Sequence, residues 1–212
     1  PFVEDTVVPP ENLSSYIREF RTLLESYGLE YAMFGHVDVG CLHVRPALNL
    51  KNPEEEGWIR ELSDKVVVLV KKYNGIMWGE HGRGFRSEYT EEFFGEELHQ
   101  ELRRIKEAFD PNNRLNPGKI VTPISNDEKV VRLEGPLRGH KDRQISAGFL
   151  KEYESAINCN GNGACFDYSQ DHVMCPSSKI TRDRLHSPQG RAGMIREWIR
   201  LLSLNQLSGV SE

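Results

Sequence analysis

Residues 29–48, LEYAMFGHVDVGCLHVRPAL, decide the fold of the first half of the chain. The stretch is rich in β-branched and aromatic residues, which favour extended structure, and it is interrupted by Gly35 and Gly40. It predicts either two strands or one strand with a bend. The choice matters because side chains alternate between the two faces along a strand.

Helical patterns lie on both sides of this stretch. Residues 11–28 repeat apolar side chains every three or four positions and stop at Gly28. Asn52 and Pro53, followed by acidic residues, predict the start of a second helix that ends near Gly75. The apolar positions are Leu13, Ile17, Phe20, Leu24 and Tyr27 in the first helix, and Trp58, Leu62, Val66, Leu69 and Tyr73 in the second.

A third helix is expected over about 96–109, and residues 2–8 read as a short extended opening. Strands that alternate with helices predict an α+β domain, an antiparallel sheet with helices packed on one face. It covers residues 1–121. Residues 122–145 are polar and irregular and are predicted to be a linker. Residues 146–212 are predicted to form a small, mostly helical and irregular module that contains cysteines.

The bulk composition excludes several classes of protein. The chain has 212 residues, of which 38% are hydrophobic, as in an ordinary soluble protein. Its net charge of −5 argues against a nucleic-acid partner. No apolar run is long enough for a membrane span. The first residues, PFVEDTVVPP, lack a starting methionine and a signal-peptide pattern, so we expect a cut within a longer, cytoplasmic chain.

Two histidines and one glutamate have residue types that suit a metal site. His36 and His43 lie seven positions apart, which would put them on opposite faces of one straight strand unless Gly40 bends it. Glu80 lies in GIMWGEHGRGFRSEY, residues 75–89. Two imidazoles and one carboxylate would make a three-ligand site with an open position. His81 would then be free to act as a general base.

The alternative for the same residues is an ordinary polar surface. Strand histidines and a glycine-rich polar loop often have no catalytic role, and spacing alone does not exclude this. Arg83 and Arg86 fit carboxylate binding because guanidinium forks match carboxylates, but such arginines are also common as solvated surface charges.

The cysteine pattern near the C-terminus indicates metal binding more than disulfides. Cys159, Cys165 and Cys175 follow the spacing C-x5-C-x9-C-P, and Asn162 stands where a C-x2-C run would need cysteine. Cysteine thiolates hold iron–sulfur clusters, but three are one short for four irons. A zinc site with His172 as fourth ligand is the alternative. Cys41 reads as a small buried residue.

Three motifs carry a resemblance to a known family. FGHVDVGCLHVRP (34–46), GEHGRGFRSEY (79–89) and AFDPNNRLNPGKI (108–120) resemble the C-terminal, or cap, domain of FAD-linked oxidases of the vanillyl-alcohol-oxidase superfamily. The branch concerned oxidises D-2-hydroxy acids. The resemblance covers about residues 1–121 and implies a ferredoxin-like cap domain.

The resemblance also implies roles for individual residues. His36, His43 and Glu80 would hold a divalent metal, zinc or manganese, and His81 would be the catalytic base. The family usually has Gly-Asp-Gly-Asn between the histidines, where this chain has Asp-Val-Gly-Cys. Arg45 stands where many relatives carry a substrate-facing Asn, and it would favour a second substrate carboxylate. Arg83 and Arg86 are the other candidate substrate ligands.

The cysteine segment carries a second resemblance. CNGNGAC, MCPS and SPQGRA resemble the start of the iron–sulfur region in long bacterial fusion proteins of the D-2-hydroxyglutarate and D-lactate dehydrogenase type. This implies FAD held mainly by an upstream domain, further cluster ligands in a downstream region, and an electron acceptor such as a quinone, with peripheral attachment to the inner membrane as an option. We expect the isolated fragment to be inactive. The alternative is a non-catalytic electron-transfer or zinc-structured adaptor.

Overall fold

A computed structural model describes residues 2–133 and 137–207, and these form two compact units, Pro1–Gly135 and Pro136–Glu212. The boundary between the units falls inside the predicted linker, so that the segments before and after it belong to different units. Part of that linker, 134–136, and the last residues of the predicted cysteine module, 208–212, lie outside the described residues.

The first unit is built on a three-stranded antiparallel sheet, which confirms the predicted fold class. The strand order is β1 (Thr6–Val7), β3 (Cys41–Pro46) and β2 (Tyr31–His36). Of the two alternatives for residues 29–48, the structure has two strands, joined by a turn at 37–40. Ile76, in the loop after the second helix, adds a single antiparallel bridge to Val7 of β1.

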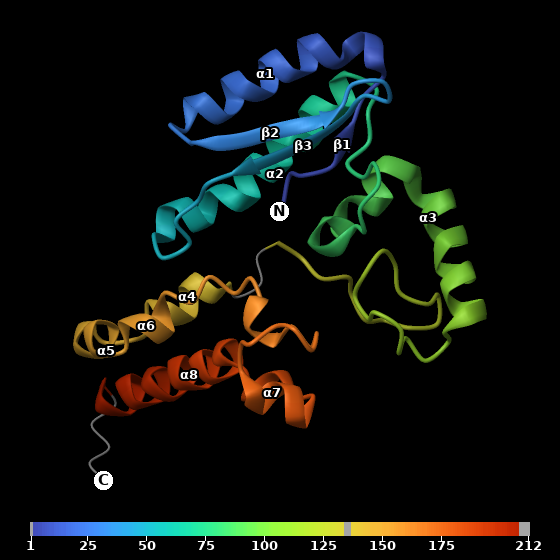
Figure 1. Ribbon diagram of the computed structural model, residues 1–212. Coiled ribbons are helices and arrows are strands. Elements are labelled where there is room, and N and C mark those ends of the chain that lie inside the picture. The colour runs from blue at the N-terminus through green and yellow to red at the C-terminus, as the bar shows by residue number, and fades with distance from the viewer. Residues whose placement is uncertain (1, 134–136, 208–212) are drawn as a thin grey trace. The chain divides into compact units, whose positions relative to one another are not determined.

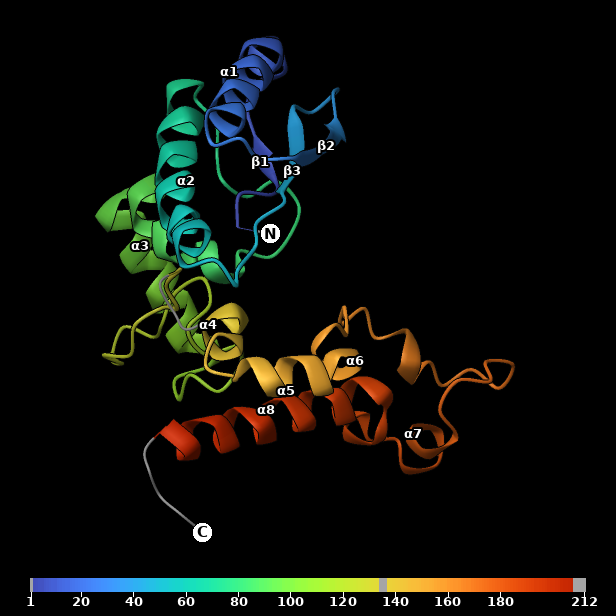
Figure 2. The ribbon, with the colours of Figure 1, turned by 90° about the vertical axis from the view of Figure 1, so that its left-hand side faces the viewer.

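Two helices cover one face of this sheet. The short turn η1 (Pro10–Asn12) leads directly into α1 (Leu13–Ser26). Figures 1 and 2 show α1 and α2 (Pro53–Lys72) on the same side of the strands. The Asn52 side chain accepts a hydrogen bond from the backbone N–H of Glu54 at 3.0 Å, so it caps α2 as predicted. The fully or nearly fully buried side chains between helices and sheet include Tyr16, Phe20, Leu24, Val44, Leu62, Val66 and Val70.

The chain then forms a 3₁₀ turn, η2 (Gly84–Tyr89), and the helix α3 (Thr90–Phe109). Gly95, with φ of 75°, breaks α3 just before the predicted helix start at Glu96. Within the described residues of the first unit, little packs on the apolar face of α3, where Leu98, Ile105 and Phe109 are exposed by 55%, 57% and 84%. On another side, Arg103 donates hydrogen bonds to carbonyls of the segment that follows, including that of Thr122.

Gly40 ends the hairpin turn in a conformation that favours glycine. Its φ is +70°, and a Cβ there would lie 1.9 Å from the carbonyl oxygen of Val8. We expect Gly40→Ala to lower the free energy of unfolding by more than about 1–2 kcal/mol, the cost of the left-handed conformation alone, because the clash adds to it. Urea unfolding measures this.

Gly28→Ala is the matched control, because Gly28 also has positive φ, +65°, while a Cβ there would meet nothing within 4 Å. Equal losses in the two variants would contradict the clash at Gly40.

The second unit is helical and irregular, as predicted. Its elements are α4 (Arg138–Asp142), α5 (Ala147–Glu152), α6 (Glu154–Ile157), η3 (Ala164–Phe166), α7 (Pro176–Thr181), η4 (Arg184–His186) and α8 (Pro188–Leu207). A small core of Ile145, Ile157 and Ile199 packs α8 against the preceding helices. Buried Arg196 of α8 pairs with Asp142 of α4. No helix in the described ranges is long and apolar enough to cross a membrane.

Candidate active site

The β2–β3 hairpin brings the two predicted histidine ligands together. His36 pairs with Cys41 across the strands, and Phe34 pairs with His43. Cross-strand partners share a face, and Cys41 and His43 are two positions apart on one strand, so His36 and His43 lie on the same face. Their ring centroids are 5.5 Å apart. The two histidines share a face despite their odd separation in sequence because a turn between two strands, and not a bend in one strand, lies between them.

Glu80 reaches this pair of histidines from the loop that follows α2. Its Oε1 lies 3.2 Å from Nε2 of His36 and 2.8 Å from Nε2 of His43. His43 is buried, whereas His36 and Glu80 are about half exposed, so the cluster opens to solvent on one side. The structure therefore brings all three predicted ligands together.

The donor set suits a divalent ion. Nitrogen and oxygen ligands bound at 2.0–2.2 Å to one ion stand about 3–3.5 Å from each other, close to the distances from Glu80 to the two imidazoles. Two histidines and one carboxylate leave further coordination positions for a substrate. The same observation permits a simpler arrangement, in which the carboxylate accepts hydrogen bonds from the two rings.

His81, the predicted base, lies beside this cluster. Its ring stacks on that of His43, with centroids 4.9 Å apart and an interplanar angle of 16°. Its Nε2 approaches Glu80 Oε1 only to 3.7 Å, and its side chain is 49% exposed. His81 is thus less tightly engaged with Glu80 than the other two histidines, and it is accessible to a small molecule.

The three candidate arginines occupy different surroundings. Arg45 is exposed, lies over the ring of Phe34, and pairs with the nearly buried carboxylate of Glu4 at 2.6 Å. The hydrogen bond from Arg45 lowers the pKa of Glu4. Because Glu4, His43 and His81 offer ligand atoms within 4.8 Å of one another, the Glu4–Arg45 pair adjoins the histidine cluster.

Arg83 and Arg86 make other contacts. The Arg83 guanidinium lies 4.5 Å from the centroid of the Trp78 ring and 4.9 Å from that of Phe94. It donates a hydrogen bond to Thr90. Arg86 is 5% exposed and donates to backbone carbonyls. Among the described residues, no hydrogen bond or ion pair joins Arg83 or Arg86 to the predicted metal ligands.

Comparison with known proteins decides the family. The model of the C-terminal domain of FAD linked oxidases matches residues 1–120. The chain belongs to this family. The matched residues contain all three motifs and the whole histidine–glutamate cluster, and they agree with the extent of the predicted resemblance, 1–121.

Two relatives extend the likeness beyond the family domain. D-2-hydroxyglutarate dehydrogenases of Pantoea ananatis and Escherichia coli are each 56% identical over 203 residues, 96% of this chain and 20% of their own length. A D-lactate dehydrogenase of Archaeoglobus fulgidus is 37% identical over 126 residues, 58% of this chain and 27% of its own length. The chain thus spans about a fifth of the length of these D-2-hydroxyglutarate dehydrogenases.

Sequence reasoning missed two acidic residues of this FAD-linked oxidase domain. Asp5 offers a ligand atom within 4.8 Å of those of Cys41, His43 and Glu80, and Glu4 contacts Arg45. Both lie in the short extended opening, where acidic residues alone carry no signal for a site. Their partners in the cluster are distant in sequence, so local patterns do not reveal them.

Cys41 lies within the cluster but is 3% exposed. Burial, followed by the nearby carboxylates of Asp5 and Glu80, raises the pKa of its thiol to about 11. The side chain is therefore a neutral thiol near pH 7, and its burial agrees with its interpretation as a small core residue.

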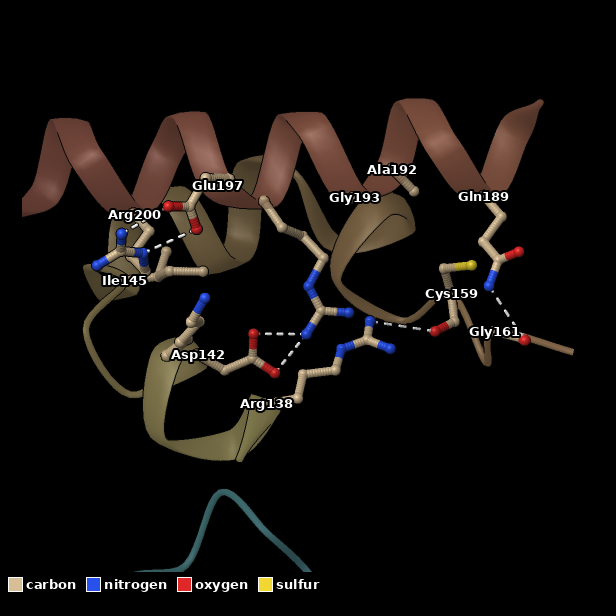
Figure 3. Close-up of a pocket in the computed structure, with 12 residues that line it drawn as sticks. Arg138, Asp142, Ile145, Cys159, Gly161, Gln189, Ala192, Gly193, Glu197 and Arg200 are labelled. Carbon is tan, nitrogen blue, oxygen red and sulfur yellow. Dashed lines mark hydrogen bonds and ion pairs between the residues drawn. The ribbon is translucent and has the colours of Figure 1, made fainter. Parts of the chain in front are cut away.

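Of the three cysteines of the second unit, Cys159 lies in a loop, Cys165 lies in η3 and Cys175 directly precedes α7. Cys159 and Gly161 line a cavity of about 290 Å³ together with Gln189, which belongs to α8 (Figure 3). The Gln189 side chain donates a hydrogen bond to the Gly161 carbonyl at 3.1 Å. The backbone N–H of Gln189 donates to Cys165 Sγ at 3.3 Å, and Arg191 donates to Cys175 Sγ at 3.3 Å. Hydrogen bonds of this kind stabilise thiolate sulfurs.

The zinc alternative for these cysteines requires its ligand atoms to converge. Within residues 137–207, no three cysteine, histidine or carboxylate ligand atoms lie within 4.8 Å of one another. A preformed mononuclear zinc site with His172 is therefore absent from that part of the chain. Ligands of an iron–sulfur cluster can stand further apart, because they bind different iron atoms.

The cysteines should differ in reactivity. Hydrogen bonds from the backbone and side chain of Ser178, and then Arg191, lower the pKa of the partly buried Cys175, whereas the pKa of the fully buried Cys41 is raised. Alkylation requires the thiolate. In reduced, metal-free protein at pH 8, we expect iodoacetamide to modify Cys175 at least about tenfold faster than Cys41. Peptide mass spectrometry measures both rates, and equal rates in the native protein would contradict the assignment.

Proposed function

We propose that this chain is part of a flavin-dependent dehydrogenase that oxidises D-2-hydroxyglutarate to the corresponding 2-oxo acid. The observation that carries the proposal is the convergence of His36, His43 and Glu80 beside the accessible ring of His81. Membership of the FAD-linked oxidase family and the likeness to D-2-hydroxyglutarate dehydrogenases support it. D-lactate is the alternative substrate, from the more distant relative.

His36, His43 and Glu80 would hold a divalent ion, zinc or manganese. A bound ion supplies positive charge that polarises the hydroxyl and carboxylate oxygens of the substrate. The chain contributes a buried imidazole, His43, whose orientation is fixed by packing, and two exposed ligands on the solvent side. This arrangement leaves the substrate's approach open.

His81 would take the proton of the substrate hydroxyl. A histidine has a pKa suited to proton transfer near neutral pH, and the exposed ring stands next to the proposed metal ligands. The C–O bond becomes a carbonyl as the α-hydrogen leaves with its two electrons. FAD, which would be held mainly by another part of the protein, would supply the acceptor for that hydride.

Arg45 would bind the second carboxylate of the substrate. Its Nε and one terminal nitrogen donate to Glu4, and its side chain is 57% exposed on the face that carries the histidines. We assign this role to Arg45 rather than to Arg83 or Arg86, because the latter are committed to aromatic rings and to backbone carbonyls. A guanidinium suits a dicarboxylate better than lactate, which has one carboxylate.

Cys159, Cys165 and Cys175 would contribute ligands to an iron–sulfur cluster through which electrons leave the flavin. N–H groups already donate hydrogen bonds to the sulfurs of Cys165 and Cys175, and such bonds stabilise thiolate ligands. The missing ligand would come from a downstream region of the same polypeptide. The final acceptor would be a carrier such as a quinone.

The test uses the full-length protein that contains this chain. We expect D-2-hydroxyglutarate to reduce an artificial electron acceptor, with the L-enantiomer inactive and with D-lactate and glycolate slower. Iron and acid-labile sulfide, measured in the same preparation, test the cluster. Turnover with D-lactate alone would replace the proposed substrate, and no turnover with any of these acids would overturn the proposed activity.

A further inference from the structure

Asp5 forms an unusual contact with the loop that carries Glu80 and His81. Its carboxylate, fully buried, accepts hydrogen bonds from three consecutive backbone N–H groups: Gly79 at 3.0 Å, Glu80 at 2.9 Å and His81 at 3.0 Å. Successive N–H groups of this kind form a concave anion site. Here the anion is a side chain of the chain itself, supplied by the residue that precedes β1.

Arg86 also holds this loop in place. Its buried guanidinium donates to the carbonyls of Met77 at 2.9 Å and Gly82 at 3.2 Å, and to the carbonyl of Glu4. It also lies 3.7 Å from the Asp5 carboxylate. The burial of the two charges is thus offset by their proximity and by hydrogen bonds.

Gly79 shows how closely the loop is pressed against β1. A Cβ at this position would lie 2.5 Å from Val7, 2.9 Å from the Cys41 sulfur and 3.0 Å from an Asp5 oxygen. The Gly79 N–H also donates to the backbone carbonyl of Asp5 at 2.8 Å. The backbone of residues 79–81 is therefore fixed relative to the sheet that carries the histidines.

We propose that Asp5, supported by Arg86, is a positioning residue that sets the metal ligand Glu80 and the base His81 in place. It acts through their backbone N–H groups and does not contact the substrate. The part of the inference that concerns metal and catalysis rests on the proposed function. The part that concerns the loop rests only on the contacts of Asp5 and Arg86.

Asp5→Asn is the sharpest variant. Asp5 has φ of 76°, a conformation that Asn tolerates as well as Asp, whereas alanine would add backbone strain. The amide keeps one oxygen acceptor but places an NH₂ group against backbone N–H groups and removes the charge that faces Arg86. The substitution therefore tests the hydrogen bonds with little change in shape.

Asp110→Asn is the matched control. Asp110 is also buried, accepts backbone N–H bonds from Arg114 at 2.9 Å and Leu115 at 2.8 Å, and pairs with Lys106 at 2.6 Å. It makes the same kind of contact in the turn after α3, away from the loop at 79–81 in sequence. Any general cost of losing a buried carboxylate should therefore appear in both variants.

The first measurement is amide hydrogen exchange on the full-length protein, followed by mass spectrometry of peptides that cover residues 76–89. We expect exchange in this segment to become about tenfold faster or more in Asp5→Asn, because the amides of Glu80 and His81 are left to compete for one oxygen acceptor, and to stay unchanged in Asp110→Asn. Unchanged exchange in Asp5→Asn would overturn the proposal, whether or not the protein binds a metal.

The second measurement is Mn²⁺ titration of chelator-treated full-length protein. We expect a 10–100-fold weaker Kd in Asp5→Asn, the usual loss when a residue that orients a ligand is changed, and no change in Asp110→Asn. Arg86→Lys, which keeps the charge but loses the guanidinium fork, should give an intermediate loss. An unchanged Mn²⁺ affinity with faster exchange would restrict Asp5 to a structural role and overturn its positioning role.

The two measurements separate this inference from the proposed function. If wild-type protein bound neither Mn²⁺ nor Zn²⁺, the proposed metal site would fail, and the exchange data would still decide whether Asp5 holds the loop. If wild-type protein bound Mn²⁺ but oxidised none of the acids, the substrate assignment would fail and the positioning test would stand.

Discussion

His81→Gln in the full-length protein should lower kcat by about 10²–10⁴-fold, the usual contribution of a general base. Glutamine keeps much of the bulk of the ring that stacks on His43 but cannot take a proton at neutral pH. The KM for D-2-hydroxyglutarate and the Mn²⁺ affinity should change little, because the proposed metal ligands remain. Steady-state kinetics with an artificial acceptor measures the effect.

His140→Gln is the control for this variant. His140 is an exposed histidine of α4 in the second unit, with Arg143 as its neighbour, and it belongs to no proposed site. Its replacement should leave kcat unchanged. If His81→Gln also turned over at the wild-type rate, the base would be a different group.

Glu80→Gln should weaken Mn²⁺ binding by more than the roughly 10–100-fold typical of residues outside the metal's own ligands. The neutral amide is a poorer ligand for a divalent ion than the carboxylate that now lies between His36 and His43. Turnover should fall with it unless Mn²⁺ is added in excess. Isothermal titration of chelator-treated protein gives the Kd directly.

Glu92→Gln is the matched control, since Glu92 is equally exposed, 45% against 46% for Glu80, and also makes an ion pair, with Lys71. If both variants bound Mn²⁺ like wild type, Glu80 would be only a hydrogen-bond acceptor for the two imidazoles.

The parts of the fold that depend on local chemistry could be predicted from the sequence. Asn52 and Pro53 predict the start of α2, because a helix cap depends only on residues that are close in sequence. The break at Gly95 explains why helical spacing is recognisable only from Glu96 onward, although the helix begins at Thr90. The exposure of the apolar face of α3 could not be predicted, because burial depends on what packs against the helix and not on the helix's own sequence.

The site was predictable in its residue types but not in its construction. His36, His43, Glu80 and His81 were recognisable by chemistry and by family motif, while their shared face required the strand register of the hairpin. The contacts of Asp5 span 74–76 residues of sequence, so no local pattern predicts them. The sequence offered three candidate arginines for substrate binding, Arg45, Arg83 and Arg86. Choosing among them required the contacts that each makes in the fold.

The attachment of the loop to Asp5 has a thermodynamic consequence. β1 contains only Thr6 and Val7, and the residue before it holds the backbone on which Glu80 stands. Whatever releases the segment around Asp5 and β1 would also release Glu80, the proposed metal ligand, so the two events would share one equilibrium. By linkage, an ion that binds Glu80 must stabilise the docked first strand by the same free energy that the docked strand adds to ion binding.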